Sequence, residues 1–316
     1  MPKTRAHQGD GSSGCKWPLI ASKETRGTVP LVCLKEALIK GRQYLKEQQN
    51  PLFNLDAQVL LSHVTGIDRT GLFLRDDQAL AVEQQQHYQK LLERRAQGEP
   101  VAYLIGHKEF MGMEFIVTPD VLIPRPDTEM MVETALRFFR DNQDYPLLAI
   151  DVGTGSGAVA VSLAALLEEL QVYAVDISRA ALEVARQNAQ RLGVKERVRF
   201  HRGNLLEPVM GELAGKVSMI TANLPYIPCG EIPSLMKDVR DFEPHLALDG
   251  GPDGLDLYRL LLPQAHKLLR PGGLLLMEIG PGQGQGAQHI LSPEQWQGAV
   301  RRDLAERERL MVAKKK

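Results

Sequence analysis

The sequence has few cysteines, almost no net charge and no long apolar run, and each of these absences excludes a class of protein. Its three cysteines, Cys15, Cys33 and Cys229, are too few and too scattered for a disulfide framework or a metal cluster. A formal net charge of −1 gives no field that would attract nucleic acid or an anionic membrane. No apolar run reaches the length of about 18 residues that suggests a membrane-spanning helix. We therefore expect a cytoplasmic protein without a metal ion, in contact with neither nucleic acid nor a membrane.

The composition is that of a globular protein with a sizeable core. Hydrophobic residues make up 43% of the chain and charged residues 24%. A length of 316 residues suggests about two domains, at roughly 150 residues each. Residues 1–30 are rich in Gly, Ser, Thr, Lys and Arg and contain no continuous apolar segment. This pattern predicts a disordered extension rather than a secretory signal.

Residues 31–98 have the periodicity of short amphipathic helices. Leu34, Leu38 and Leu45 form one apolar stripe, and helix-breaking residues interrupt the pattern at intervals. We expect a bundle of four or five helices, with Asp56 capping one helix start. Two interpretations stay open for this bundle: a module that recognises a partner, and a structural cap on the next domain.

Residues 99–120 predict a β-hairpin linker. Val101–Gly106 and Met113–Val117 are short apolar runs with the composition of strands, and Gly112 suits the turn between them. The following run holds Arg125 between two prolines, which keeps its backbone extended. We expect Asp127 or Thr128 to cap a helix that begins near Glu129.

Residues 121–316 alternate between short apolar runs and helical stretches, the pattern of a doubly wound, mostly parallel sheet. Two further runs near the chain end predict an antiparallel pair at one edge. The total is seven strands, the number typical of S-adenosylmethionine-dependent methyltransferases with a Rossmann-like class I fold. The predicted strands are Leu147–Val152, Val172–Val175, Val198–His201, Val217–Ala222, Leu274–Ile279, Gly298–Leu304 and Arg309–Ala313.

A glycine-rich loop follows the first of these strands. Gly153, Gly155 and Gly157 allow a sharp turn and the close approach of a ligand, with Thr154 and Ser156 between them. Asp176 ends the second strand, at the sequence spacing of roughly 20 residues from the glycine loop where a carboxylate binds ribose hydroxyls. The same spacing also satisfies the dinucleotide fingerprint, so the loop alone leaves open an NAD-dependent oxidoreductase. After the third strand, Asn204 and Leu205 occupy the place where methyltransferases commonly bracket adenine.

The fourth strand runs into Asn223-Leu224-Pro225-Tyr226. The prolines keep this turn out of a helix, and Leu224 is held extended because a proline follows it. The Asn223 side-chain oxygen and the Leu224 carbonyl can then accept both hydrogens of one –NH2 group, beside the aromatic face of Tyr226. The alternative is an ordinary turn whose asparagine caps a neighbouring segment. A clamp of this kind, rather than a hydride partner, favours a methyltransferase over the oxidoreductase.

These segments carry a family resemblance. The turn resembles the Asn-Pro-Pro-Tyr motif of methyltransferases that alkylate planar –NH2 groups, with Leu224 in place of the first proline. The chain from about Leu34 to Ala313 is similar to the HemK/PrmC family of peptide chain release factor glutamine methyltransferases. The resemblance also rests on four further runs: Leu122-Ile123-Pro124-Arg125-Pro126-Asp127-Thr128-Glu129, Glu243-Pro244 with Leu248-Asp249-Gly250-Gly251-Pro252-Asp253-Gly254-Leu255, Leu269-Arg270-Pro271-Gly272-Gly273, and Glu278-Ile279-Gly280.

The resemblance implies methyl transfer from S-adenosyl-L-methionine to the side-chain amide N5 of the glutamine in the Gly-Gly-Gln motif of class I release factors. The product would be S-adenosyl-L-homocysteine, and we expect a monomer. Three sets of residues are implied. They are the catalytic residues Asn223, Leu224 and Tyr226; the cofactor-binding residues Gly153, Thr154, Gly155, Ser156, Gly157, Asp176, Asn204, Leu205 and Asn223; and the substrate-binding residues Asn223, Leu224, Pro225, Tyr226 and Arg125.

Three other functions stay open at this point. A ribosomal-protein glutamine methyltransferase would share the clamp, but the Pro124–Glu129 run argues against it. A DNA adenine methyltransferase would carry a larger recognition segment and a basic face. A non-catalytic cofactor-binding protein is compatible with two departures from the family pattern. Leu224 stands in place of a proline, and Asn204 stands in place of the usual acidic residue.

Overall fold

This computed structural model describes residues 32–316, which divide into two compact units between Gln97 and Gly98. The extension predicted over residues 1–30 lies outside the described residues. The domain boundaries predicted at 31–98, 99–120 and 121–316 stay predictions.

The first unit is a four-helix bundle, as the periodicity predicts. Its core is made of buried leucines, and the Tyr88 hydroxyl inside it donates to the Ala57 carbonyl at 3.0 Å. Gly66 ends the second helix in a left-handed conformation, with φ of 68°. The helices are α1 (Leu34–Glu47), α2 (Phe53–Thr65), α3 (Arg69–Leu74) and α4 (Val82–Ala96).

The prediction that Asp56 caps a helix is wrong. The helix begins three residues earlier, at Phe53, because Asn50 turns the chain by accepting the Leu52 N–H at 2.8 Å. Asp56 therefore lies inside α2, where its carboxylate accepts from Asn50 Nδ2 at 2.8 Å. It also pairs with Arg95 at 2.6 Å, and both side chains are buried. Its role is to tie α2 to α4.

The second unit begins with a short helix where a strand was predicted. Val101–Gly106 is wrong as a strand: residues Val101–Ile105 form α5, and Gly106 ends it in a left-handed conformation at φ 78°. The helix begins because the carbonyl of Pro100 accepts the N–H groups of Tyr103 and Leu104. A five-residue apolar run does not by itself distinguish a strand from a helix.

The hairpin is present, but its first strand lies later than predicted. It consists of β1 (His107–Phe110) and β2 (Met113–Ile116), paired antiparallel. Met111 and Gly112 make the two-residue turn, both with positive φ (53° and 72°), which suits the twist of a tight hairpin. Gly112 is thus at the turn, as predicted.

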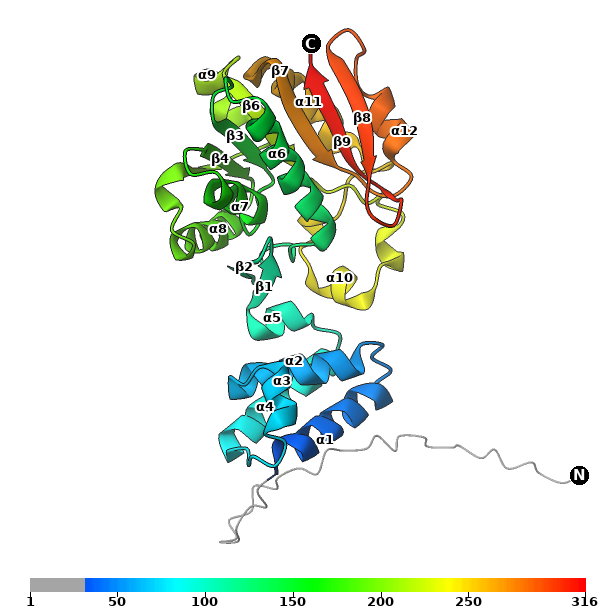
Figure 1. Ribbon diagram of the computed structural model, residues 1–316. Helices are drawn as coiled ribbons and strands as arrows, with labels where there is room; N and C mark the ends of the chain where they lie inside the picture. The colour runs from blue at the N-terminus through cyan, green and yellow to red at the C-terminus, as the bar shows by residue number, and fades with distance from the viewer. Residues whose placement is uncertain (1–31) are drawn as a thin grey trace, which may run out of the picture. The chain divides into compact units, whose positions relative to one another are not determined.

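A seven-stranded sheet forms the centre of the second unit and has the predicted Rossmann-like class I architecture (Figure 1). All strands are parallel except β9. All six residues of β6 are buried, as expected of a central strand covered on both faces. In sheet order the strands are β5 (Val198–Arg202), β4 (Gln171–Asp176), β3 (Leu148–Val152), β6 (Val217–Ala222), β7 (Leu269–Glu278), β9 (Glu308–Lys315) and β8 (Trp296–Arg302).

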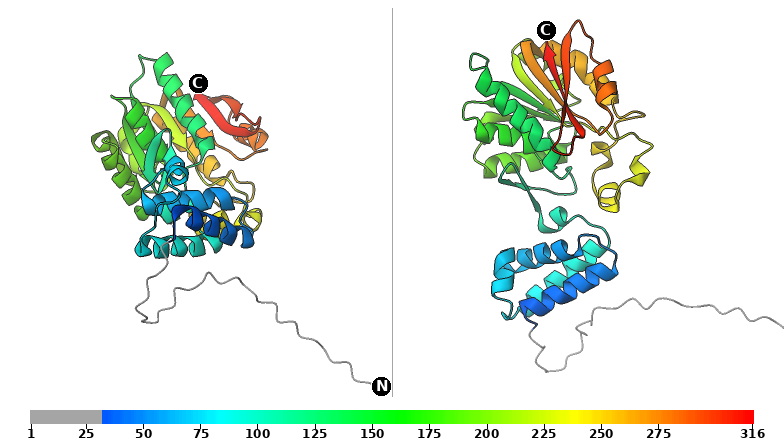
Figure 2. Two further views of the ribbon diagram at one scale, coloured as in Figure 1. Left: turned by 60° about the horizontal axis from the view of Figure 1, so that its bottom comes forward. Right: turned by 45° about the vertical axis from the view of Figure 1, so that its right-hand side comes forward.

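Helices cover both faces of this sheet (Figure 2). Two apolar clusters lie on its opposite sides, one packed beneath α6 and α7 and the other beneath α11. The hairpin phenylalanines Phe110 and Phe115 belong to the first cluster, which anchors the hairpin on this unit. The helices are α6 (Glu129–Asp141), α7 (Ala158–Leu166), α8 (Arg179–Arg191), α9 (Met210–Leu213), α10 (Lys237–Phe242), α11 (Asp256–Leu268) and α12 (Gly284–His289). Single 3-10 turns are η1 (Pro126–Thr128), η2 (Lys195–Arg197), η3 (Glu207–Val209), η4 (Ile232–Ser234) and η5 (His245–Ala247).

The strand boundaries differ from the predictions mainly near the chain end. The strand predicted at Leu274–Ile279 begins earlier, at Leu269, which pairs with Val217 before a register shift. The strand predicted at Gly298–Leu304 is Trp296–Arg302. It ends early because the Asp303 carboxylate accepts the N–H groups of Ala305 and Arg307, at 2.8 and 3.0 Å, and so closes a turn.

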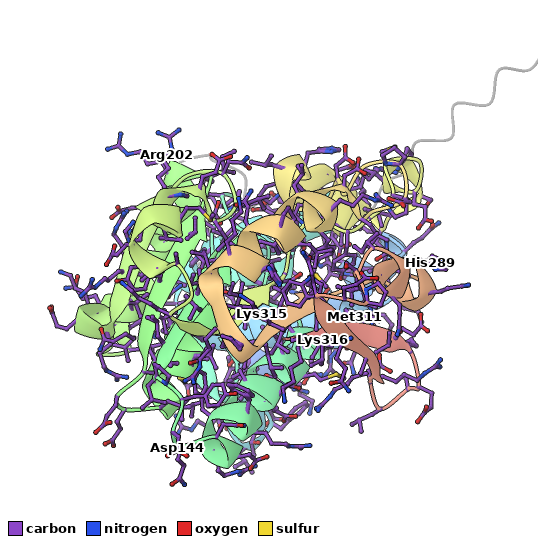
Figure 3. All side chains as sticks on the ribbon, turned by 90° about the horizontal axis from the view of Figure 1, so that it is seen from above. Asp144, Arg202, His289, Met311, Lys315 and Lys316 are labelled. Carbon is purple, nitrogen blue, oxygen red and sulfur yellow. The ribbon has the colours of Figure 1, made fainter. Side chains whose placement is uncertain are left out.

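Hydrogen bonds from the Lys315 side chain hold the last strand, β9, against neighbouring elements. Lys315 Nζ donates to the His266 carbonyl at 2.5 Å and to the Leu269 carbonyl at 2.8 Å, joining β9 to α11 and β7. Viewed from above, Met311 and Lys315 lie inside the outline of the molecule, whereas Arg202 and Asp144 lie at its edge (Figure 3). Across residues 32–316, no helix is long and apolar enough to cross a membrane.

Candidate active site at the carboxyl edge of the sheet

A cavity lies where the strand order reverses. β3 is followed along the chain by β4 and β5 on one side, while β6 lies on its other side, so the β3–β6 boundary is a topological switch point. Ligands of open α/β sheets bind outside the carboxyl ends of the strands at such a point. The cavity encloses about 230 Å³, far more than the ~10–15 Å³ that one water needs. It can therefore hold a ligand of many atoms.

Most of the predicted site residues line this cavity. The structure brings together Arg125, Gly153, Thr154, Gly155, Ser156, Asp176, Asn204, Leu205, Asn223, Leu224 and Pro225. Two predicted residues, Gly157 and Tyr226, are not among its lining. Gly157 lies at the start of α7 with φ of 80°, where a side chain would meet Ala185 at 3.1 Å, so it lets α7 pack against α8.

The glycine loop is held in place by hydrogen bonds that its own backbone N–H groups donate. The N–H groups of Gly153 and Thr154 both donate to the Val175 carbonyl, at 2.8 and 3.1 Å. Gly155 N–H donates to Asp176 Oδ2 at 2.9 Å, and Gly157 N–H to the Thr154 carbonyl at 2.7 Å. Four of the five N–H groups over residues 153–157 are thus already bonded. Such a loop offers few donors to a pyrophosphate, unlike the loop of a dinucleotide-binding fold.

Gly153 is needed where the loop passes the Asn223 turn. Its φ is 69°, and a Cβ there would come within 2.9 Å of Leu224 Cδ2. Leu224 itself is buried. The leucine that stands in place of a proline therefore packs directly on the glycine loop and joins the two halves of the cavity.

The Asp176 carboxylate is positioned by two backbone donors. Gly155 N–H binds one oxygen, and Ser178 N–H binds the other at 2.8 Å. Burial raises the pKa of Asp176, while these hydrogen bonds lower it. Each carboxylate oxygen keeps a second acceptor site, so a fixed pair of acceptors remains for two neighbouring hydroxyls.

Asp151 also lines the cavity and was not predicted as a site residue. It ends β3 buried, and its two oxygens accept from the hydroxyls of Thr154 and Thr221, each at 2.7 Å. Burial raises its pKa to about 6, against the lowering effect of these bonds. The carboxylate therefore ties the glycine loop to β6. Its position two residues before Gly153 was the sequence feature that could have indicated a site residue.

Asn204 and Leu205 lie at the adjacent end of β5. Asn204 is exposed, and its Nδ2 donates to Glu207 at 3.2 Å, which leaves its side-chain oxygen as an acceptor. Leu205 is buried at a φ of 48°, a conformation that costs energy for a leucine. The strain accompanies a turn that places both residues at the cavity wall.

The Asn223 turn supplies the acceptors that the sequence predicts. Asn223 is half-buried directly after β6, and its Nδ2 donates to Thr128 Oγ1 at 3.2 Å. Within residues 32–316, neither Asn223 Oδ1 nor the Leu224 carbonyl accepts a hydrogen bond. Both residues line the cavity. Two adjacent oxygens are therefore available to an –NH2 group, and the Asn223 side chain does not cap a segment.

Thr128 and Asp127 were predicted as helix caps, and this is wrong for both. Thr128 stands at the N-cap position of α6 without a capping bond, because its own backbone is helical (φ −69°, ψ −19°) rather than extended. Its hydroxyl donates to Glu278 Oε2 at 2.6 Å. Asp127 pairs with Arg309 at 3.0 Å. Tyr226 donates to the second oxygen of Glu278 at 3.2 Å. A buried carboxylate at the end of β7 thus organises the back of the site.

The ends of β6 and β7 are joined by Tyr258. Its hydroxyl is buried and bonds the carbonyls of both Ala222 and Glu278. Burial raises its pKa well above the usual value. This contact fixes the strand end from which Asn223 departs.

Arg125 is held by a buried carboxylate. Its Nη2 lies 2.6 Å from Glu243 Oε1, and the Glu243 side chain is 1% exposed whereas the Arg125 side chain is 35% exposed. Burial raises the pKa of Glu243, and Arg125 lowers it. This ion pair therefore joins two segments, around Arg125 and around Glu243, that are far apart in the sequence. Arg125 also lines the cavity.

A glycine-rich segment supports the turn from behind. Gly250 N–H donates to the Ile227 carbonyl at 2.9 Å, and Ile227 N–H to the Leu248 carbonyl at 3.1 Å. Gln283 Nε2 donates to the Tyr226 carbonyl at 2.8 Å. The backbone of Tyr226 and Ile227 is thus fixed by these three hydrogen bonds.

The arrangement has a defined chemical capacity. Asp176 can accept two hydroxyls of a ribose without a phosphate, because a carboxylate repels a phosphate. The cavity holds two carboxylates, Asp151 and Asp176, which suits a ligand that carries positive charge. The Asn223 turn can hold an –NH2 group beside it. The residues therefore fit S-adenosylmethionine together with an amine or amide acceptor. Among residues 32–316, no group of three potential metal ligands is placed to hold a metal ion.

The chain is similar in sequence to known methyltransferases. Residues 36–106 match the family described as PrmC N-terminal domain, and residues 147–292 match a methyltransferase domain. The release factor glutamine methyltransferase of Moorella thermoacetica is 49% identical over 75% of this chain and 81% of its own. That of Clostridium acetobutylicum is 38% identical over 89% of this chain and 98% of its own. The solved structure of a methyltransferase from Pyrococcus furiosus has a TM-score of 0.46 at 18% identity, over 66% of this chain and 91% of that one.

Proposed function

This chain belongs to the family of release factor glutamine methyltransferases, and we propose that it methylates the side-chain amide N5 of the glutamine in the Gly-Gly-Gln motif of class I release factors. It is an S-adenosylmethionine-dependent methyltransferase. The observation that carries the proposal is the Asn223 turn, which offers two adjacent unpaired oxygens at the switch-point cavity.

The proposed roles begin with cofactor binding. Asp176 would accept the two ribose hydroxyls, and the Gly153–Gly155 backbone would lie against the ligand without side chains in the way. Asn204 and Leu205 would contact the adenine. When bound, the cofactor supplies an electrophilic methyl group on a sulfonium.

The Asn223 turn would perform the catalytic positioning. An amide nitrogen is a poor nucleophile because its lone pair is delocalised into its carbonyl. When Asn223 Oδ1 and the Leu224 carbonyl accept both N–H hydrogens, the lone-pair face has one orientation. The same oxygens stabilise the positive charge that develops on the nitrogen. The alkylated amide then loses a proton to water, because such a nitrogen is strongly acidic, so no catalytic base is required.

Arg125 and the helical unit would recognise the protein substrate. Arg125 lines the cavity and is partly exposed, while Glu243 fixes its position. The first unit matches the PrmC N-terminal domain, and it exposes the apolar side chains of Phe73 and Leu74. We propose that it docks the release factor.

A direct test uses a purified class I release factor, labelled cofactor and peptide mass spectrometry. One methyl group should appear on the glutamine of the Gly-Gly-Gln motif. A matched release factor with asparagine in place of that glutamine should remain unlabelled. Label on a ribosomal protein but not on the release factor would replace this proposal with the alternative substrate.

Cofactor choice gives a second prediction. The protein should bind S-adenosylmethionine and S-adenosylhomocysteine but not NAD at comparable concentrations. Four of the five loop N–H groups are already bonded, and two carboxylates line the cavity, so a pyrophosphate meets repulsion and few donors. Thermal shift measured with each ligand checks this. Stronger stabilisation by NAD would contradict the assignment of the cavity.

Asp176→Ala should weaken S-adenosylmethionine binding by a factor on the order of 10 to 10². A hydrogen bond to a charged acceptor is worth roughly 1.5–3 kcal/mol, and the variant also releases the N–H groups of Gly155 and Ser178. Asp176→Asn, which keeps one acceptor oxygen, should lose less affinity. Calorimetry measures both variants. Unchanged affinity in Asp176→Ala would remove this residue from the site.

A further inference from the structure

A buried polar chain stands behind the Asn223 side chain and comes from three elements. Glu278 ends β7, Thr128 precedes α6, and Asn223 and Tyr226 follow β6. Thr128 and Glu278 are only 4% and 3% exposed. The Thr128 hydroxyl lies 2.6 Å from Glu278 Oε2 and 3.2 Å from Asn223 Nδ2. The contacts therefore run continuously from a buried carboxylate to the proposed substrate clamp.

The chemistry of these groups gives the chain one direction. An ionised carboxylate only accepts hydrogen bonds, so the single hydroxyl hydrogen of Thr128 is directed to Glu278. Thr128 Oγ1 is then left with lone pairs alone, and it can only accept from Asn223. The Asn223 amide must present its Nδ2 to Thr128, which leaves its oxygen for the cavity.

The second oxygen of Glu278 also accepts a hydrogen bond. Tyr226 donates its hydroxyl hydrogen to Oε1 at 3.2 Å. Both oxygens of the Glu278 carboxylate thus accept from O–H groups, and neither donates to Thr128. Burial raises the pKa of Glu278, while the two O–H donors lower it, and Asp127 and Arg309 act on it in opposite senses. Only the ionised form accepts from both hydroxyls without donating.

An asparagine amide is nearly symmetric in shape, so packing alone does not select its orientation. A reversed Asn223 would place its oxygen against the acceptor atom of Thr128, and its –NH2 group would face the –NH2 group of the substrate. Two donors facing each other cannot bond. The clamp described under the proposed function therefore depends on which way this amide is turned.

We propose that Thr128 and Glu278 are positioning residues that fix the Asn223 amide with its oxygen toward the substrate nitrogen. This inference rests on the proposed function, because it gives Asn223 Oδ1 the role of accepting a substrate N–H. It also gives a role to Thr128 in the segment Pro124–Glu129 and to Glu278 in the segment Glu278–Gly280. Neither residue is required to touch the reacting atoms.

The test compares Thr128→Val, which removes the hydroxyl at constant shape, with Thr128→Ser, which restores it. Thr128→Val should lower kcat by about tenfold or more, since a buried hydrogen bond that selects one orientation is lost, while the affinity for S-adenosylmethionine and the KM for the release factor stay close to those of the parent. Thr128→Ser should recover most of kcat. Glu278→Gln should lower kcat in the same way, because its amide can donate to Thr128 and so releases the constraint.

A matched control is available in the helix that follows Thr128. Thr134 is buried in α6, and its hydroxyl accepts from Arg301 at 3.3 Å, away from Glu278. Thr134→Val should therefore leave kcat unchanged even if it lowers the melting temperature. If Thr128→Val loses kcat only in proportion to its melting temperature and cofactor affinity, its role is structural and the inference is wrong.

A double-mutant cycle separates this inference from the proposed function. In an Asn223→Ala background the effect of Thr128→Val on kcat should disappear, because no amide remains to be oriented. Additive losses would overturn the inference and leave Asn223 in its role. Full activity in Asn223→Ala alone would contradict the proposed function itself.

Discussion

Replacing Asn223 by alanine should lower kcat for methyl transfer to a release factor by a factor on the order of 10² or more, by analogy with the removal of one preorganised oxyanion-hole donor. The affinity for S-adenosylmethionine should change far less, because Asp176 and the glycine loop lie on other strand ends. Discontinuous assays with labelled cofactor and a purified release factor measure kcat, and calorimetry measures the affinity for S-adenosylmethionine.

The size of this effect follows from the geometry of the turn. Asn223 supplies one of two acceptors, and the other is a backbone carbonyl that cannot hold both hydrogens of the substrate amide. Without the side chain the –NH2 group can rotate, so the lone pair is no longer aimed and the developing charge loses an acceptor. The Leu224 carbonyl remains, so a residual rate is expected.

Asn142→Ala is the matched control. Asn142 follows α6 and its Nδ2 donates to the Phe138 carbonyl at 2.8 Å, so the same truncation there removes only a helix-terminal bond. Its kcat should equal that of the parent. If the two alanine variants have equal activity, the substrate amide is held by groups other than Asn223.

The strands and the site location could be predicted because both depend on local patterns. The buried run Val217–Ala222 is a strand with the predicted bounds, since all its side chains are covered. The residues after β3, β4, β5 and β6 gather at one cavity because parallel strands end at one edge. Knowing where strands end was therefore enough to locate the candidate site.

The back of the site could not be predicted because its contacts are remote in sequence. Thr128 carried the pattern of a helix cap, but its partner Glu278 is 150 residues away. Arg125 and Glu243 are 118 residues apart. A carboxylate in a strand gives no local sign of which hydroxyl it will meet. The helix at Val101–Ile105 was missed for a different reason: its length suits either type of element.

The second large effect concerns a residue that touches no ligand. Gly250→Ala should lower kcat by a factor on the order of 10², since a shift of about 1 Å at a positioned catalytic group can cost that much. A Cβ at Gly250 would lie 2.7 Å from the Pro225 carbonyl oxygen and 2.8 Å from both Tyr226 Cα and Gly254 Cα. All three atoms are backbone, so no side chain can move aside. The Asn223 turn must shift instead.

The structural cost should be visible separately. Forcing one extra methyl group into a packed site typically costs about 1–3 kcal/mol, so the melting temperature of Gly250→Ala should fall. Its kcat is therefore measured well below that temperature, where the protein is folded. Asp176 and the glycine loop lie on other strand ends, so cofactor affinity should fall less than kcat.

Gly230→Ala provides the comparison. Gly230 lies on the segment that follows β6, its φ is not positive, and a Cβ there would meet no atom within 4 Å. The change of composition is identical, but it should leave both kcat and the melting temperature at the parent values. Equal kcat in the two variants would mean that the Gly250 segment adapts without moving Pro225 and Tyr226. A selective loss in Gly250→Ala would show that the close backbone contact holds the substrate clamp in place.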